Sequence, residues 1–140
     1  MGANAVHPPR MFPLMLDLTG ATVFVVGAGA ALGGRLDSLK QHAVARIHVF
    51  AANPNAEAQG IAGARLVPRW PEAPDFTEHR PRLVFIADVA DVDAARSADL
   101  AHAAGALVHV QDRIPLCDFH LPAILRRGHL QVTVSTDGKA

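Results

Sequence analysis

Hydrophobic residues along the chain gather in short continuous runs, separated by polar segments that contain prolines and glycines. Runs of about four to eight β-branched, aliphatic and aromatic residues are typical of strands that are covered on both faces of a sheet. Four such runs are residues 21–27, 45–51, 82–88 and 106–112. A fifth and weaker run, 64–69, contains Pro68 and therefore predicts a strand at an edge of the sheet.

Other segments space their apolar residues as helices do. Residues 30–43 carry leucines at helical spacing, and the alanine-rich segment 91–105 ends at Gly105, a residue that tolerates the left-handed turn at a helix end. Residues 53–63 predict a short and poor helix. The segment 70–81 holds three prolines and predicts a loop.

The C-terminal part adds a predicted helix over 121–128, ended by Gly128, and a sixth strand over 129–136. Strands that alternate with helices predict an α/β fold, with a Rossmann-like parallel sheet and helices on both faces. We expect one domain across residues 1–140, because this length suits a single hydrophobic core. Residues 1–10 are expected to be a flexible lead-in, followed by an extended strand up to residue 16.

Composition narrows the function classes. Half of the residues are hydrophobic, which argues against disorder of the whole chain. Thirteen basic residues balance thirteen acidic ones, so no net field attracts nucleic acid or an anionic membrane surface. No run approaches the roughly 20 apolar residues that span a bilayer. Cys117 is the sole cysteine, which excludes an internal disulfide and a cysteine-rich zinc site, and we expect a cytoplasmic location.

The first predicted strand runs into a glycine-rich turn, VGAGAALGG, that opens the first helix. Gly27 and Gly29 begin a G-x-G-x-x-x-G spacing, which is one residue longer than the usual dinucleotide-binding pattern. Glycine in such a turn admits positive φ and lets a pyrophosphate approach the backbone, and the free N–H groups of the helix attract the phosphates. The turn predicts a dinucleotide site, with a tight turn that binds no ligand as the alternative.

Polar side chains follow three of the predicted strands, at the edge where open α/β sheets bind ligands. They are Asn53 after the second strand, Asp88 after the fourth and Asp112 after the fifth. The second strand is followed by neither an acid for a ribose hydroxyl nor an Arg for a 2′-phosphate, so the choice between NAD and NADP stays open. Asp88 could cap the next helix and Asp112 could fix a turn, or either carboxylate could accept a proton or hold a cation.

Three histidines flank Asp112 in the sequence, at positions 109, 120 and 129. His109 lies three residues back in a strand and faces the opposite side from Asp112, so we expect no permanent metal site. Cys117 has no obvious base beside it and is expected to be a small buried apolar residue rather than a nucleophile.

Two segments, taken in order, resemble the N-terminal half of siroheme synthase, which is the precorrin-2 dehydrogenase and sirohydrochlorin ferrochelatase family. They are MFPLMLDLTGATVFVVGAGA and LVHVQDRIPLCDFHLPAILRRGHLQVTVSTDGKA. The family pattern runs from an FP-aliphatic-LDL-G strand through a glycine loop to NVVD-P-LCDF-PA-RRG-L-V-VST-GK. Enzymes of this family oxidise precorrin-2 to sirohydrochlorin with NAD, and many then insert ferrous iron. The resemblance therefore implies NAD as cofactor, a tetrapyrrole substrate, ferrous iron as a second substrate, and a homodimer at full length.

The resemblance also assigns residues. The catalytic aspartate of the family falls on Asp112, as general base in the dehydrogenation and as an aid to proton removal or metal entry during chelation. The positions that contact the cofactor fall on Gly27, Ala28, Gly29, Ala30, Ala31, Ala52, Asn53 and Asp88.

The chain departs from the family pattern at several positions. Ala28 replaces the middle one of three glycines, Arg35 is the one positive charge where the family has two, and Asp88 and His109 replace a threonine and an asparagine. The family also continues past VST-GK into a helical region for dimerisation and tetrapyrrole binding, which we expect to be missing here. The alternative to a dehydrogenase is therefore a non-catalytic nucleotide-binding module or a truncated fragment.

Overall fold

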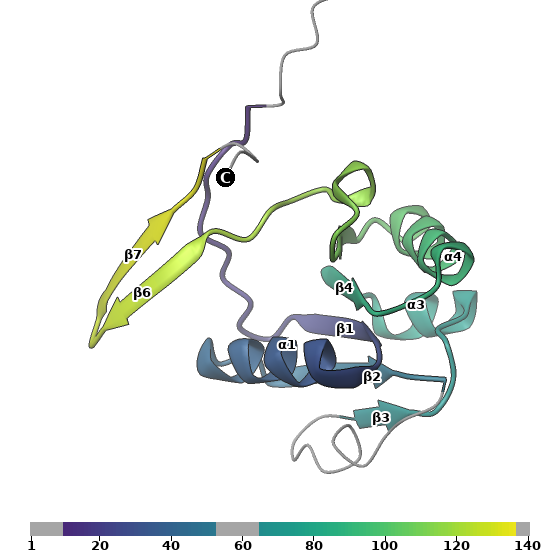
Figure 1. Cartoon of the computed structure of the whole chain (residues 1–140). Coiled ribbons are helices and arrows are strands. Elements are labelled where there is room, and N and C mark those ends of the chain that lie inside the picture. Colours follow the sequence, from purple (N-terminus) through teal and green to yellow (C-terminus); the bar gives the residue numbers. More distant parts are fainter. Residues whose placement is uncertain (1–9, 53–64, 137–140) are drawn as a thin grey trace, which may run out of the picture. The chain divides into compact units, whose positions relative to one another are not determined.

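The computed structural model describes residues 10–52 and 65–136, which divide into two compact units (Figure 1). The larger unit is Asp17–Asp118, and the smaller one joins the described residues up to Leu16 with those from Phe119 on. The larger unit holds a five-stranded sheet with its helices, and the smaller unit holds a two-stranded sheet. No helix in the described part of the chain has the length and apolar character to cross a membrane.

The strands of the larger unit are all parallel and lie in the order β3-β2-β1-β4-β5. Their bounds are β1 (Thr22–Gly27), β2 (Arg46–Phe50), β3 (Arg65–Val67), β4 (Leu83–Ala87) and β5 (Leu107–Val110). The five strands predicted for this sheet are confirmed, with β3 at an edge. The order turns back between β1 and β4, and the crevice at such a switch point is where open α/β sheets bind ligands.

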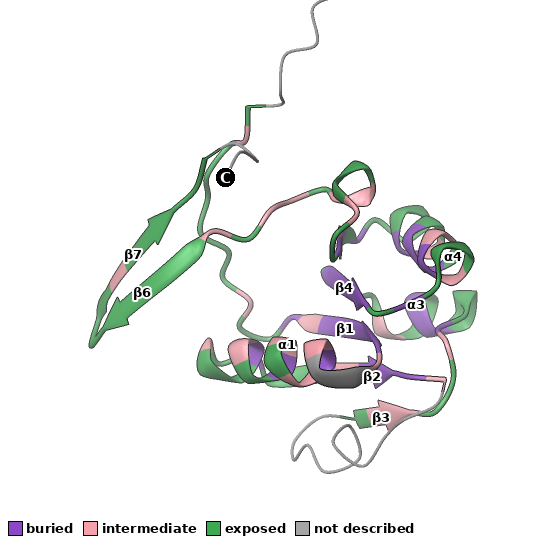
Figure 2. Ribbon diagram, viewed as in Figure 1, coloured by how far each residue is buried: buried purple, intermediate pink, exposed green. Residues whose placement is uncertain are grey.

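Helices cover both faces of this sheet, as the sequence predicts (Figure 1). They are α1 (Gly29–Gln41), α3 (Ala73–His79) and α4 (Asp91–Ala103). Buried side chains recur at helical spacing on two of them: Leu32, Leu36 and Leu39 on α1, and Ala94, Ala98 and Ala101 on α4. Figure 2 shows β1 and β4 buried, while the outer sides of the helices are exposed.

The core on the α3 and α4 side is built around Phe24, whose ring centroid lies 4.8 Å from that of Phe50 and 5.1 Å from that of Phe76. Because successive side chains of a strand point to opposite faces, Val23 and Val25 turn toward the face that α1 covers. Both are almost completely buried, so β1 is covered on its two faces as its continuous apolar run predicts.

The prediction of a loop over 70–81 is wrong, because residues 73–79 form α3. Glu72 and Asp75 make a reciprocal capping box, in which each side chain accepts a hydrogen bond from the backbone N–H of the other residue. Pro74 lies in the first turn, where a helix leaves N–H groups unpaired in any case. The Arg69 guanidinium donates to both carboxylate oxygens of Asp75, at 2.7 and 2.9 Å, and this bond lowers the pKa of Asp75.

The prediction of a helix over 121–128 is also wrong. Residues Ala123–Arg127 form strand β6, which pairs antiparallel with β7 (Leu130–Val134). Gly128, expected at a helix end, has φ 58° in the tight turn between the two strands. The sixth predicted strand is thus confirmed as a strand, but it lies in this separate hairpin and not in the parallel sheet.

The extended strand expected before residue 17 is not seen, since the described residues 10–18 take part in neither sheet. A turn follows at Thr19–Gly20, where the Thr19 N–H donates to the Asp17 carboxylate at 2.9 Å. The poor helix expected over 53–63 lies outside the described residues.

Candidate active site at the switch point

The glycine turn after β1 is shaped by its neighbour β4. Gly27 pairs with Ala87, and a Cβ atom added to Gly27 would lie 2.3 Å from the Ala87 carbonyl oxygen. Gly27 does not have positive φ, so glycine is needed here because the β4 backbone comes so close. Gly33, which completes the spacing seen in the sequence, lies within α1 with nothing within 4 Å of an added Cβ. The turn therefore gains its shape from Gly27.

The N-terminus of α1 is suited to an anion. Ala28 precedes it in an extended conformation, with φ −154° and ψ 168°, and offers no side-chain hydrogen bond to the first turn. The first turn also contains no acidic residue. Its N–H groups and the positive end of the helix dipole are thus left for a bound phosphate. These features fit the pyrophosphate of a dinucleotide, as the sequence pattern predicts.

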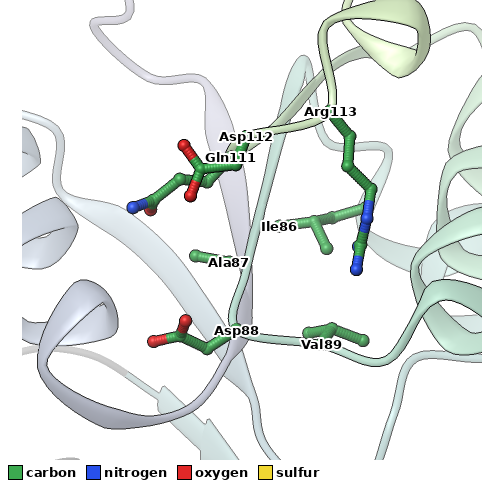
Figure 3. A pocket seen from close by; sticks show the side chains of 7 residues that line it. All are labelled: Ile86, Ala87, Asp88, Val89, Gln111, Asp112 and Arg113. Atoms are coloured by element: carbon green, nitrogen blue, oxygen red, sulfur yellow. The ribbon is translucent and has the colours of Figure 1, made fainter.

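A cavity of about 270 Å³ lies at the carboxyl ends of β4 and β5, where Ala87 pairs with Gly27 of the glycine turn (Figure 3). It is lined by Ile86, Ala87, Asp88, Val89, Gln111, Asp112 and Arg113. In Figure 3 the side chains of Asp88, Asp112 and Gln111 extend toward the same side of the pocket, whereas Arg113 extends along the other side. The fold thus brings together two of the carboxylates that the sequence places after separate strands.

Both carboxylates stand on left-handed backbone. The φ angle is 55° at Asp88 and 64° at Asp112, a conformation that costs a residue with a side chain roughly 1 kcal/mol or more and that concentrates at functional sites. Asp88 does not cap the next helix: Ala90 is the N-cap of α4, without a side-chain hydrogen bond. The capping alternative for Asp88 is therefore wrong, and both aspartates are exposed at the cavity.

The loop after β5 is held on both sides of Asp112. The Gln111 N–H donates to the Ile86 carbonyl at 2.9 Å, which continues the β4–β5 ladder by one residue. Arg113 forms an ion pair with Asp91 at the start of α4. A single 3₁₀ turn, Ile114–Leu116, follows. Gln111 is a cavity residue that the sequence pattern does not single out, although it is a neighbour of Asp112.

Two of the departures from the family pattern meet at one aromatic ring on the α1 side. The Arg35 guanidinium lies 4.8 Å from the centre of the Phe85 ring, and its partial burial lowers the Arg35 pKa. The His109 ring centroid lies 6.1 Å from that of Phe85. A cation over an aromatic face is stabilising. Arg35 and His109 thus pack around Phe85 and do not line the cavity.

The remaining predicted residues lie near the same edge of the sheet. Gly29, Ala30 and Ala31 form the start of α1, and Ala52 follows β2, while Asn53 lies outside the described residues. The glycine turn does not line the cavity that joins Asp88 and Asp112. Within the described ranges, no group of three or more His, Cys, Asp or Glu side chains could hold a metal ion.

Comparison with known proteins supports these assignments at the level of family and fold. Residues 14–123 match a protein-family model described as "Putative NAD(P)-binding". A siroheme synthase of Neisseria meningitidis serogroup C (strain 053442) is 33% identical over 132 residues, which cover 92% of this chain and 27% of the relative. Siroheme synthase 1 of Klebsiella pneumoniae is 32% identical over 131 residues, covering 91% of this chain and 27% of the relative. The chain thus spans about a quarter of the length of these relatives.

A solved structure has the same fold. The structure titled "SirC, precorrin-2 dehydrogenase" superposes with a TM-score of 0.67 at 26% identity, covering 91% of this chain and 62% of that one. The Rossmann-like architecture predicted from the alternation of strands and helices is confirmed by this match and by the strand order.

Proposed function

The chain belongs to the NAD(P)-binding family that its residues 14–123 match, and from this premise we propose that it oxidises precorrin-2 to sirohydrochlorin with NAD as hydride acceptor. The siroheme synthases and the precorrin-2 dehydrogenase that resemble it support this substrate. The observation that carries the proposal is the exposed Asp112 carboxylate, which lines a cavity at the carboxyl ends of β4 and β5, where Ala87 pairs with Gly27 of the glycine turn.

We assign the cofactor site to the edge formed by the β1–α1 turn and the end of β2. Gly27 and Ala28 bring the backbone close to the pyrophosphate, whose charge the first turn of α1 stabilises. We assign the adenosine ribose to Ala52, which follows β2, and to the next residue in the sequence, Asn53, which lies outside the described residues. We favour NAD over NADP because the family that the sequence resembles uses NAD, and the stretch from Ala51 to Ala64 contains no Arg or Lys for a 2′-phosphate.

The dehydrogenation removes a hydride and a proton from precorrin-2. The nicotinamide, when bound, supplies the site that takes the hydride. Asp112 accepts the proton as its carboxylate, and general-base catalysis of this kind contributes about 10²–10⁴-fold to a rate. Gln111, on the same side of the cavity, offers an amide that can hydrogen-bond a substrate carboxylate.

We also propose that the same cavity serves insertion of ferrous iron into sirohydrochlorin. Insertion requires removal of two pyrrole N–H protons, and Asp88 and Asp112 present two carboxylates in one pocket. Carboxylate oxygens also bind an incoming divalent cation as it loses water. In this proposal iron is a substrate and not a resident cofactor.

The smaller unit supports a homodimer as the working form. Directly opposite residues of an antiparallel pair share a face, and the pairs Ala123–Val134 and Leu125–Val132 place apolar side chains together. Leu125, Val132 and Val134 are exposed. A lone two-stranded hairpin is marginally stable in water, so a second copy that covers this face would stabilise it.

Substitution of Asp112 by Asn tests the dehydrogenase. The purified chain is mixed with NAD and precorrin-2 without oxygen, and sirohydrochlorin absorbance is followed. We expect kcat to fall by about 100-fold or more, because the amide accepts no proton, while the Kd for NAD changes less than about twofold. Asp99→Asn, at an exposed carboxylate of α4, is the control and should keep full activity. An equally active Asp112→Asn variant would show that another group takes the proton.

A further inference from the structure

The outer edge of β5 is closed by a short return of the chain. As the last strand of the sheet, β5 pairs with β4 on one edge, and its other edge leaves backbone groups of Val108 and Val110 without a strand partner. Asp118 forms hydrogen bonds with both backbone groups of Val108. The Asp118 N–H donates to the Val108 carbonyl at 2.7 Å, and Asp118 Oδ2 accepts a hydrogen bond from the Val108 N–H at 2.8 Å. Asp118 therefore replaces a neighbouring strand at this position.

The Cys117 thiol forms hydrogen bonds with both backbone groups of Val110. The Val110 N–H donates to Cys117 Sγ at 3.2 Å, and the thiol donates back to the Val110 carbonyl at 3.2 Å. The expectation of an inert, apolar Cys117 is thus incomplete, since this half-buried thiol has hydrogen-bonding partners. Together, Cys117 and Asp118 satisfy all four backbone groups of Val108 and Val110 on this edge. We call these contacts the β5 clamp.

Helix α4 adds a third anchor to the clamp. His102 Nε2 lies 2.6 Å from Asp118 Oδ2, the same oxygen that accepts the Val108 N–H. One carboxylate oxygen thus joins β5, α4 and the returning chain. Both side chains are only partly buried, so solvent weakens any ion pair between them. The contact therefore fixes the position of Asp118 relative to α4 more than it adds stability.

The clamp closes the loop that carries Asp112. The loop leaves β5 at Val110 and returns to it at Cys117, so residues 111–116 are held at both ends. Asp112 sits inside this loop with φ 64°, a conformation that persists only where the surrounding structure enforces it. Neither Cys117 nor Asp118 lines the cavity. Their effect on the site therefore passes through the backbone of the loop.

We propose that Asp118 is a positioning residue: through the β5 clamp it holds Asp112 in the left-handed conformation that directs its carboxylate to the cavity. This inference rests on the proposed dehydrogenase function. Protection of an exposed sheet edge is the competing explanation of the same contacts, and it predicts changes in association but none in catalysis.

The test compares Asp118→Ala with Asp118→Asn. Ala removes the acceptor for the Val108 N–H, whereas Asn keeps an oxygen at that place. We expect Asp118→Ala to lower kcat about tenfold, since small misplacements of a reacting group have effects of this size, with the Kd for NAD within about twofold of the parent. The Val108 amide should exchange with solvent about tenfold faster. In Asp118→Asn, both kcat and the exchange rate of the Val108 amide should stay close to the values of the parent.

Arg69→Gln is the matched control, because it breaks the ion pair with Asp75 at α3 and lowers stability away from the loop. An unchanged kcat in Asp118→Ala, or an equal loss in Arg69→Gln, would overturn the proposal. If Asp118→Ala does not fold, His102→Gln is compared with Arg69→Gln instead, and we expect it to lower kcat by about threefold.

The exchange measurement separates this inference from the function on which it rests. If the parent chain does not oxidise precorrin-2, the dehydrogenase proposal fails. The backbone chemical shifts of Asp112 then test, without any activity, whether the β5 clamp holds its conformation. Shifts that move away from left-handed values in Asp118→Ala would support the positioning role. Unchanged shifts with a faster Val108 exchange would refute it.

Discussion

Asp88 and Asp112 show how single residues are directed into a site. Each follows the end of a strand and adopts positive φ, and together they line the cavity at the carboxyl ends of β4 and β5. Aspartate tolerates the left-handed region better than most residues because its short side chain can bond locally. Two such positions on neighbouring strands direct two carboxylates to one cavity.

Gly27→Ala tests the close approach of β1 and β4. The new Cβ would lie 2.3 Å from the Ala87 carbonyl oxygen, so the backbones must separate. We expect the free energy of unfolding to fall by about 1–3 kcal/mol, measured by urea denaturation. Gly33→Ala is the control, with open space around its Cβ inside α1 and an expected gain of about 0.5–1 kcal/mol. Equal effects of both changes would contradict this account.

His48 predicts how stability depends on pH. Burial, followed by the nearby His79 and Arg65, lowers its pKa below 6.5, against smaller opposing effects of Asp75 and Glu78. The His48 and His79 ring centroids are 4.3 Å apart. The folded state thus binds fewer protons than the unfolded chain just below pH 6.5, and stability falls as the pH falls through this range.

We expect the urea midpoint to drop between pH 8 and about pH 5.5, and to drop less in His48→Phe, which keeps the contact with Phe24. His129→Asn, at an exposed histidine of the hairpin turn, should follow the parent. The same pH dependence in His48→Phe and the parent would show that His48 is not responsible.

The β6–β7 hairpin is the element to which we assign the proposed dimer interface. Its strands are exposed throughout nearly their whole length (Figure 2). The face with Leu125 and Val132 is apolar except for Arg127 at its end, whereas the opposite face carries the pairs Ile124–Thr133 and Arg126–Gln131. This difference between the two faces indicates which one a second copy would cover.

Val132→Lys places a charge on the apolar face and should disrupt the proposed homodimer. We expect the dimer Kd, measured by sedimentation velocity, to rise by about tenfold or more, because a buried unpaired charge is strongly unfavourable. Thr133→Lys puts the same charge on the opposite face of β7 and should leave the Kd unchanged. If both variants dimerise like the parent, the interface lies elsewhere.

The whole molecule combines a neutral net charge with a site at the switch point of the sheet. Thirteen acidic and thirteen basic residues produce no overall field, so recognition of an anionic cofactor must rest on local groups. The strand order β3-β2-β1-β4-β5 supplies them, because it places the start of α1 and the ends of β4 and β5 at one edge.

Binding of NAD should therefore stabilise the whole chain. At a free NAD concentration of 100 times its Kd, the free energy of unfolding should rise by about 2.7 kcal/mol, seen as a higher Tm in calorimetry. NADP at the same concentration should raise the Tm less, because no Arg or Lys lies between Ala51 and Ala64. A larger shift with NADP would reverse the cofactor assignment.

Sequence patterns were most informative where the signal is local. Continuous apolar runs predicted β1, β2, β4 and β5, since strands covered on both faces need apolar residues at every position. The errors fell where the outcome depends on partners. In α3, the prolines suggested a loop, but the capping box and Arg69 favour a helix. In β6, the residues of 121–128 suit a helix or a strand, and pairing with β7 decided for the strand.

The sequence by itself determined the alternation of strands and helices, the glycine turn and the position of Asp112 after a strand, because each depends on residues close together in the chain. Only the tertiary structure decided that Asp88 lines the same cavity as Asp112, that Gly27 is required by the Ala87 carbonyl, and that Asp118 closes the β5 edge. These contacts join segments that the strand order brings together, and a local pattern carries no information about such neighbours.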